Sequence, residues 1–291
     1  MNPSALSTST PSFPARGDSS IGGLLLESGK ITPENAERVL RMQKELGIRF
    51  GEAAQRLGLI TEADIQHVLA RQFDYPYLLK GESQYSPLLV AAYEPFSPQV
   101  EILRAVRSQL MLRWFASHKS LVVAGINPGD GVSTFVANLA VVFSQLGENT
   151  LLVDANLRNP SQHTIFNSPS RQGLSDALAG RAELDTTSNK IGAFVSLSLL
   201  NAGTLPPNPQ ELLSRPSFRA MTEQIEARHD VVLYDVPPFS AGADALAIAS
   251  RVGGVLLVAR KNETLVSDID AMTEQLTHSG AKVVGAVMVD F

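Results

Sequence analysis

The stretch GINPGDGVSTFVANLA, residues 125–140, follows an apolar run and decides the fold of most of the chain. It has the layout of a phosphate-binding loop, in which glycines let the backbone curl so that amides at a helix start can bind an anion. The consensus for such a loop is G-x-x-x-x-G-K-[ST], and Val132 stands at the lysine position. The sequence therefore predicts a nucleotide-type fold that has lost its phosphate-binding lysine.

Apolar, β-rich runs alternate with helical stretches from residue 119 onward. This alternation predicts an α/β fold, with a mostly parallel sheet of the P-loop type that carries helices on both faces. In such a sheet, ligands bind at the carboxyl ends of the strands. The predicted strands are 120–126, 149–155, 196–202, 230–236, 254–260 and 282–289.

Polar motifs follow three of these strands. The phosphate loop follows the first strand, Asp154 and Asn156 follow the second, and Asp235 ends the fourth in the place of a Walker B aspartate. One aspartate after an apolar strand is more often a cap than a metal ligand, but three motifs in this order indicate a nucleotide site. The predicted nucleotide-binding residues are Pro128, Gly129, Asp130, Gly131, Val132, Ser133 and Thr134. The predicted Mg²⁺ ligands are Ser133, Asp154, Asn156 and Asp235.

Together with GLSDALAG (173–180), NAGTLPPNPQELL (201–213) and DALAIA (244–249), these motifs resemble the bacterial tyrosine kinases (BY-kinases) of polysaccharide export. The likeness begins near residue 86, and the arrangement is closest to EpsG-type proteins of exopolysaccharide operons. The resemblance implies a kinase domain that uses ATP or ADP with Mg²⁺, with Asp154 as the candidate base for a tyrosine hydroxyl. It also implies a homo-oligomer that works beside a membrane-embedded chain-length or co-polymerase protein.

A strong helix is predicted in EILRAVRSQLMLRW, residues 101–114, where Glu101, Arg104 and Arg107 recur every three residues. Taken alone, such a series is usually a solvated charged face. In the family that the chain resembles, E-x-x-R-x-x-R mediates ring-like self-association. The resemblance therefore implies that Glu101, Arg104 and Arg107 lie at a subunit interface.

The chain departs from the family pattern at three points. The family loop reads P-G-E-G-K-S-T, whereas this chain has PGDGVST, and Asn156 replaces the second aspartate of D-x-D. Family members also carry a C-terminal cluster of tyrosines, whereas this sequence ends GAVMVDF, so we expect no autophosphorylation of the usual kind. Loss of a hydrogen bond to a charged group, about 1.5–3 kcal/mol, would weaken nucleotide affinity roughly ten- to hundredfold.

These departures leave three hypotheses open. In the first, the chain is a degenerate kinase, or pseudokinase, that regulates assembly in exopolysaccharide polymerisation and export. In the second, it is an active tyrosine kinase or ATPase that modifies a partner in trans without the loop lysine. The third, a MinD- or ParA-like positioning ATPase, also requires a loop lysine, so Val132 counts against it equally.

A duplication precedes this domain, because residues 20–43 align without gaps on residues 49–72. Each copy has the pattern of a short helix, a glycine turn and a second helix, which predicts a small all-helical domain. Thr32 is the predicted N-cap of one helix, and Thr61 with Asp64 is a predicted capping box of another. On periodicity alone, this is a partner-binding module.

The duplicated units also resemble the MshEN domain of type II secretion ATPases, whose paired motif binds cyclic di-GMP. The resemblance implies a cyclic di-GMP site, although Ser20 replaces the arginine of the first copy, and serine cannot stack on guanine or fork hydrogen bonds to it. The implied ligand-binding residues are Gly22, Leu25, Leu26, Gly29, Leu40, Gln43, Arg49, Gly51, Gly58, Leu69 and Gln72.

Composition limits the function further. The 291 residues carry a net charge of −5, which gives no electrostatic reason to bind nucleic acid, and contain no cysteine for disulfides or thiolate chemistry. No apolar run approaches the roughly 20 residues that span a bilayer, so we expect a cytoplasmic protein that reaches the inner membrane through a partner. The predicted organisation is a disordered tail (1–19), the duplicated domain (20–72), a linker (73–98) and the P-loop domain (99–291).

Overall fold

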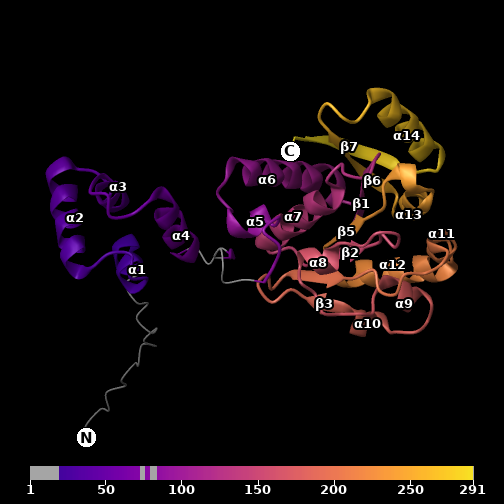
Figure 1. The fold of residues 1–291 in the computed structure, drawn as a ribbon, viewed down its shortest axis with the longest axis horizontal. Coiled ribbons are helices and arrows are strands. Elements are labelled where there is room, and N and C mark those ends of the chain that lie inside the picture. Colours follow the sequence, from indigo (N-terminus) through magenta and orange to yellow (C-terminus); the bar gives the residue numbers. More distant parts are fainter. Residues whose placement is uncertain (1–19, 73–75, 79–83, 291) are drawn as a thin grey trace, which may run out of the picture. The chain divides into compact units, whose positions relative to one another are not determined.

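The computed structural model describes residues 20–72, 76–78 and 84–290. The chain divides into two compact units, Met1–Tyr75 and Pro76–Phe291 (Figure 1). No helix in the described ranges is both long and apolar enough to cross a bilayer.

The front unit confirms the duplicated helix–turn–helix pattern. Its described residues form α1 (Ile21–Glu27), α2 (Pro33–Leu46), α3 (Phe50–Arg56) and α4 (Glu62–Gln72). The turns within the two copies pass through Gly29 and Gly58, whose φ angles of 67° and 66° lie in the left-handed region that favours glycine. The apolar core includes Leu25, Val39, Ala53 and Val68.

The predicted helix caps are also present. The Thr32 side chain accepts a hydrogen bond from the Asn35 amide, and the Thr61 amide donates to the Asp64 carboxylate at 2.8 Å. The Asp64 amide donates back to the Thr61 hydroxyl oxygen, which completes the capping box. The Lys30 ammonium and the Thr61 hydrogen bonds hold the pKa of Asp64 at about 2, against the opposing effect of burial.

The second unit is built on a seven-stranded sheet in its described residues, with the order β3-β4-β2-β5-β1-β6-β7. The pairs are parallel except for β3 with β4, which is antiparallel. The strands are β1 (Ser120–Gly125), β2 (Thr150–Asp154), β3 (Ser188–Lys190), β4 (Leu197–Leu200), β5 (Val231–Asp235), β6 (Gly254–Arg260) and β7 (Lys282–Val289). All six predicted strands are therefore confirmed, and the short antiparallel β3 is an addition to them.

Helices cover both faces of this sheet (Figure 1). On β1, Leu121 and Val123 face one apolar cluster, whereas Val122 and Ala124 face the other, as the two-residue period of a strand requires. The helices and single turns are α5 (Val90–Tyr93), α6 (Pro98–Leu110), η1 (Met111–Phe115), α7 (Val132–Gln145), α8 (Gln162–Ile165), α9 (Leu174–Leu178), α10 (Leu184–Thr187), α11 (Pro209–Leu213), α12 (Pro216–Arg228), η2 (Phe239–Ala241), α13 (Asp244–Val252) and α14 (Val266–His278).

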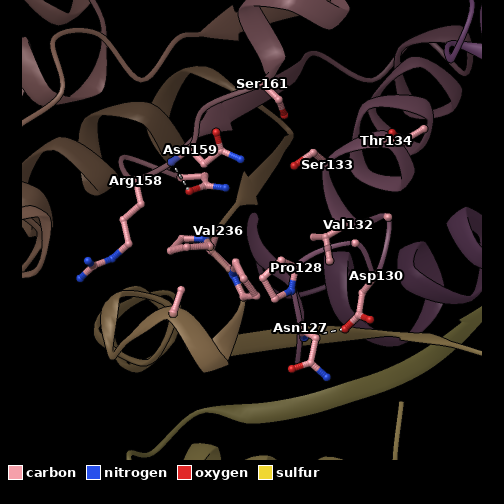
Figure 2. A pocket seen from close by; sticks show the side chains of 16 residues that line it. Asn127, Pro128, Asp130, Val132, Ser133, Thr134, Arg158, Asn159, Ser161 and Val236 are labelled. Atoms are coloured by element: carbon pink, nitrogen blue, oxygen red, sulfur yellow. Dashed lines mark hydrogen bonds between the residues drawn. The ribbon is translucent and has the colours of Figure 1, made fainter. Parts of the chain in front are cut away.

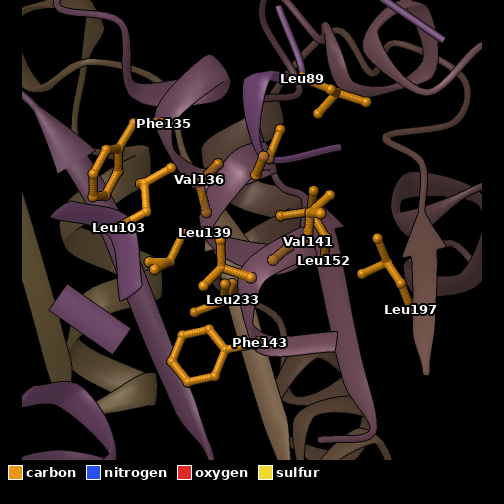
Figure 3. Packing of buried hydrophobic residues seen from close by; sticks show 14 of the residues in the cluster. Leu89, Leu103, Phe135, Val136, Leu139, Val141, Phe143, Leu152, Leu197 and Leu233 are labelled. Atoms are coloured by element: carbon orange, nitrogen blue, oxygen red, sulfur yellow. The ribbon is translucent and has the colours of Figure 1, made fainter. Parts of the chain in front are cut away.

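Helix α7, which starts in the phosphate loop, is the most deeply buried helix of the unit. Every residue from Phe135 to Ser144 is buried, which fits a helix that is apolar on all sides. Leu139 and Phe143 of α7 share a cluster with Leu233 of β5 and Leu103 of α6 (Figure 3). This packing holds α7 against one face of the sheet.

The predicted linker, 73–98, needs correction in its second half. Leu89, Ala91 and Ala92 are fully buried, and the Asn138 side chain of α7 accepts from the Ala91 amide at 2.8 Å and donates to the Leu88 carbonyl at 2.8 Å. This segment is part of the second unit rather than an extended connector. One four-residue helical turn is too short to show a periodic pattern. Residues 73–75 and 79–83 lie outside the described residues.

The predicted helix 101–114 is present, with one change. It begins at Pro98, three residues early, and its last turn, Met111–Phe115, has π-helical hydrogen bonding. Trp114 in this turn is buried, and its indole N–H donates to the Ser120 carbonyl at 2.8 Å. The wider turn directs Trp114 against Gly254, where an added Cβ would lie 2.1 Å from the indole.

Candidate nucleotide-binding site

The loop between β1 and α7 has the geometry of a phosphate-binding loop. Gly129 and Gly131 have φ angles of 92° and 77°, which an L side chain would oppose. The Asp130 carboxylate turns back into the loop and accepts from the amides of Ile126 and Asn127 at 2.9 and 2.8 Å. Asp130 therefore closes the loop on itself and leaves the amides at the start of α7 available to an anion.

A pocket of about 310 Å³ opens over this loop (Figure 2). All seven residues predicted to bind the nucleotide line it, and Asn156 and Arg158 contribute from the segment after β2. The remaining lining residues are Asn127, Asn159, Ser161, Val236, Pro237, Pro238 and Ala241. The structure thus brings the three predicted motifs together around one cavity.

Val132 does not replace the missing cation. Its Cγ2 lies 2.7 Å from the position that a Cβ on Gly125 would occupy, and the half-buried side chain packs on the core cluster beneath the loop. Among the pocket-lining residues, all within the described ranges, Arg158 is the only basic one, and its guanidinium is paired with the buried carboxylate of Asp244 at the start of α13. The end of the loop therefore has no ammonium group.

Asp154 and Asp235 lie opposite each other at the ends of β2 and β5, and both are fully buried. Burial raises the pKa of Asp154 well above its ordinary value, and the neighbouring Asp235 charge raises it further. Burial likewise raises the pKa of Asp235 to about 6, although hydrogen bonds from Gln162 and Ser133 oppose this shift. Two buried carboxylates at a strand edge create a strong preference for a cation.

The carboxylate pair fits a magnesium ion in chemistry, because Asp235 Oδ1 is buried without a hydrogen-bond partner. Within the described residues, however, no group of three or more His, Asp or Glu side chains is arranged around a metal position. Hydroxyl, amide or phosphate oxygens would have to complete the coordination shell of the ion. Ser133, in the first turn of α7, could supply a hydroxyl oxygen. When bound, such an ion would offset charge on a nucleotide's phosphates.

The surroundings of Asp154 differ from those of an exposed base. Its carboxylate accepts from the backbone amides of Ser161, Gln162 and Asn156, at 3.1, 3.0 and 3.3 Å, and it is not among the pocket-lining residues. The Asn156 side chain accepts from the Asn159 amide at 3.0 Å and so shapes the same turn. In this conformation, a substrate hydroxyl would reach Asp154 only after the 156–162 segment moves.

Sequence reasoning missed Gln162, which belongs to none of the recognised motifs. It is fully buried, and its side-chain Nε2 donates to Asp235 Oδ2 at 2.7 Å and to the Ser133 carbonyl at 3.0 Å. The only signal in the sequence was its position eight residues beyond Asp154.

The motifs at 173–180 and 201–213 meet at Asp176. Its Oδ2 accepts from the amides of Gly173 and Thr204, at 3.2 and 3.0 Å, so one buried carboxylate joins the two segments. An added Cβ on Gly173 would lie 2.0 Å from the Asn201 carbonyl oxygen, so the close approach requires glycine here. These motifs therefore have a structural role beside the site.

The three residues of the predicted interface have different surroundings on α6. Arg104 pairs with Glu101 and donates to the Pro95 carbonyl at 2.6 Å, while Arg107 donates to the Val142 carbonyl near the end of α7 at 2.9 Å. Glu101 keeps 62% of its side-chain surface exposed, against 17% for Arg104. Both arginines therefore make contacts within the subunit.

In the front unit, several residues predicted to bind the ligand have structural roles in packing and in turns. Gly22 and Gly51 allow close packing, since an added Cβ would lie 3.2 Å from the Phe50 ring and 3.0 Å from Ile65, respectively. Gly29 and Gly58 make the turns, and Leu25 is fully buried. Leu26, Leu40 and Arg49 are exposed, Gln43 and Leu69 are half-buried, and the side chain of Gln72 lies outside the described residues.

Ser20 and Arg49 occupy equivalent positions, because each is the N-cap of the first helix in its copy. The Ser20 hydroxyl accepts from the Gly23 amide at 3.2 Å, whereas Arg49 makes no side-chain cap hydrogen bond. The alignment of the two copies is therefore correct at this residue.

Comparison with known proteins agrees with this geometry. Residues 118–269, just over half of the chain, match the family model described as cellulose biosynthesis protein BcsQ. The putative tyrosine-protein kinase CapB of Staphylococcus aureus is 32% identical over 212 residues, which cover 72% of this chain and 92% of that relative. The chain belongs to the bacterial tyrosine-kinase family. By the family model, its second unit also belongs with the BcsQ proteins.

Two further relatives define the extent of this BY-kinase similarity. A putative tyrosine-protein kinase in the cps region of Klebsiella pneumoniae is 31% identical over 91% of this chain, but the chain spans only 34% of the length of that relative. The kinase domain of the Escherichia coli tyrosine kinase ETK has a TM-score of 0.67 and 29% identity, with 72% of this chain and 82% of that domain covered. The P-loop α/β architecture of the second unit is thus that of a BY-kinase domain.

Proposed function

We propose that this BY-kinase relative is a degenerate kinase that regulates assembly in bacterial exopolysaccharide polymerisation and export. The observation that carries the proposal is Val132, which packs toward Gly125 and offers no charge to terminal phosphates. Phosphoryl transfer depends on positioning and electrostatic stabilisation, so loss of the loop lysine affects the transfer step more than binding. Asn156, in place of a second aspartate, removes another charge from the metal site.

In this proposal, the protein acts at the cytoplasmic face of the inner membrane through a membrane-embedded chain-length or co-polymerase protein. Support comes from relatives named as tyrosine kinases, one of them in a cps region. The protein would form a homo-oligomer through α6, where Glu101 is the most accessible of the three motif residues. ATP or ADP with Mg²⁺ would be a weakly held ligand that shapes this assembly.

A phosphotransfer assay tests the proposal. Purified full-length protein is incubated with ATP and Mg²⁺, alone and with its operon's membrane protein, and phosphotyrosine is measured. We expect no signal above that of an Asp154→Asn variant. Robust phosphotyrosine formation that is lost in Asp154→Asn would overturn the degenerate assignment.

The second candidate is an active kinase or ATPase that phosphorylates a partner in trans. What favours it is the preserved phosphate loop with Ser133 and the Asp154–Asp235 carboxylate pair. It predicts tight, Mg²⁺-dependent ATP binding in calorimetry. Affinity in the millimolar range or weaker would exclude it.

For the front unit, we propose cyclic di-GMP sensing through the exposed residues Leu26, Leu40 and Arg49. An exposed arginine suits a ligand with a flat base and a phosphate, because the guanidinium can stack on the base and bind phosphate, and exposed leucines can add apolar contacts. Calorimetry with cyclic di-GMP tests this: Arg49→Ala should abolish binding, while Arg41→Ala, an exposed arginine on α2, should not. Equal affinity in both variants would contradict the assigned site.

A further inference from the structure

Gln162 is the residue at which the three loops of the site meet. Its backbone amide donates to Asp154 Oδ2 at 3.0 Å, at the end of β2. Its side-chain Nε2 donates to Asp235 Oδ2 at 2.7 Å, at the end of β5, and to the Ser133 carbonyl at 3.0 Å, in the first turn of α7. One fully buried residue thus links the two acidic motifs to the phosphate loop.

The donors to the buried carboxylate pair carry no charge. In the described part of the chain, Asp154 accepts from three backbone amides, and Asp235 accepts from the side-chain amide of Gln162. Buried carboxylates normally require a cation, or several hydrogen bonds in its place. Since Val132 contributes no charge, neutral donors hold this pair together.

Two buried oxygen atoms without hydrogen-bond partners show where a cation could bind. Asp235 Oδ1 and Gln162 Oε1 are both buried without hydrogen-bond partners, and both are acceptors. They belong to two side chains that are already hydrogen-bonded through their other atoms. The site therefore has oxygen atoms suited to a divalent ion, while Gln162 maintains its shape without one.

We propose that Gln162 is a positioning residue, a neutral clamp that holds the phosphate loop and Asp235 in register when no nucleotide or metal is bound. The inference goes beyond the proposed function, because it concerns the ligand-free protein and holds whether or not phosphate is transferred. It explains how a loop without a lysine keeps its binding geometry. A cation-dependent site would instead loosen on loss of its ligands.

Hydrogen exchange on the full-length protein in EDTA tests the clamp. Gln162→Leu removes the amide at similar volume, and we expect exchange in residues 128–136 to become at least about tenfold faster. Gln145→Leu is the matched control, because Gln145 Nε2 also donates to two backbone carbonyls, those of Pro76 and Ala91, at the other end of α7. The control should leave 128–136 unchanged. Unchanged exchange in Gln162→Leu, or equal acceleration in both variants, would overturn the proposal.

A second variant gives a readout that general destabilisation cannot mimic. Gln162→Glu replaces the donor by a carboxylate beside Asp235, so the metal-free protein should lose roughly 5–10 °C in Tm. Millimolar MgCl₂ should restore most of this loss, because a cation would then bridge the carboxylates, whereas Gln145→Glu should show no such recovery. The same Mg²⁺ effect in Gln162→Glu as in the unmodified protein would refute the clamp. The phosphotransfer assay decides the proposed function separately.

Discussion

Asp154 and Asp235 end neighbouring parallel strands opposite each other, and neither side chain is exposed. Such a pair is destabilising by itself, since each negative charge disfavours the other and burial disfavours both. Clusters with perturbed pKa values are characteristic of functional sites. Beneath a loop without lysine, the charge of this pair should therefore have a measurable effect on stability and on ligand binding.

The first prediction concerns pH. The pKa of Asp235 is raised from 3.8 to about 6, so the folded protein binds more protons than the unfolded chain between these values. The free energy of unfolding of the metal-free protein should therefore fall as pH rises through this window. Asp235→Asn removes the ionisation and should stabilise the metal-free protein by about 2–3 kcal/mol at pH 7.5, with little effect at pH 3.5.

Urea unfolding in EDTA at several pH values checks this prediction. Asp270→Asn makes the same chemical change on an exposed part of α14 and should show no comparable pH-dependent gain. A stability difference between Asp235→Asn and the unmodified protein that stays constant from pH 3.5 to 7.5 would contradict the predicted effect of burial.

The second prediction restores the loop cation. Val132→Lys should strengthen ATP binding roughly ten- to hundredfold, because an ammonium would again reach the terminal phosphates. The lysine stem has no branch at Cβ, and Gly125 beside Val132 carries no side chain that the stem would meet. Calorimetry with ATP and Mg²⁺ measures the change.

Val132→Met is the matched control for the new charge, since it extends the side chain without adding a cation. It should leave ATP affinity within about threefold of the original. If Val132→Lys and Val132→Met bind ATP equally, the missing ammonium is not what limits the site, and the case for a degenerate kinase loses its main support.

The sequence predicted the parts of this fold that follow from repeating patterns. Six strands, the phosphate loop and the capped helices of the front unit could be predicted, because hydrophobic periodicity, glycines in turns and N-cap residues are signals within a few residues of the element they specify. Single side-chain contacts between residues far apart in the sequence could not be predicted. Asn138 binds the segment 88–91 from about 50 residues away, and Gln162 reaches Asp235 across 73 residues. No local sequence pattern marks either side-chain amide. The folding of residues 88–91 onto α7 and the role of Gln162 in the site could therefore be found only from the structure.

The third prediction tests assembly through α6. Glu101→Lys should reduce self-association at least about tenfold in light scattering, because Glu101 is the exposed member of the motif and its reversal would place like charges at the interface. Glu274→Lys, an exposed site on α14, is the control for net charge. Arg107 is a poorer choice for substitution, since its loss also removes the hydrogen bond to the Val142 carbonyl. Unchanged association in Glu101→Lys would exclude this face as the interface.

The fourth prediction concerns the asymmetry of the front unit. Ser20 and Arg49 are equivalent N-caps, so Ser20→Arg should give the first copy the side chain that the second copy has, and cyclic di-GMP affinity should rise roughly tenfold. The change also removes the hydrogen bond to the Gly23 amide, which should lower stability by about 1 kcal/mol. Ser20→Ala carries the same capping loss without the guanidinium and should not gain affinity. Equal affinity in Ser20→Arg and Ser20→Ala would mean that the N-cap positions do not face the ligand, and the cyclic di-GMP proposal would fail with them.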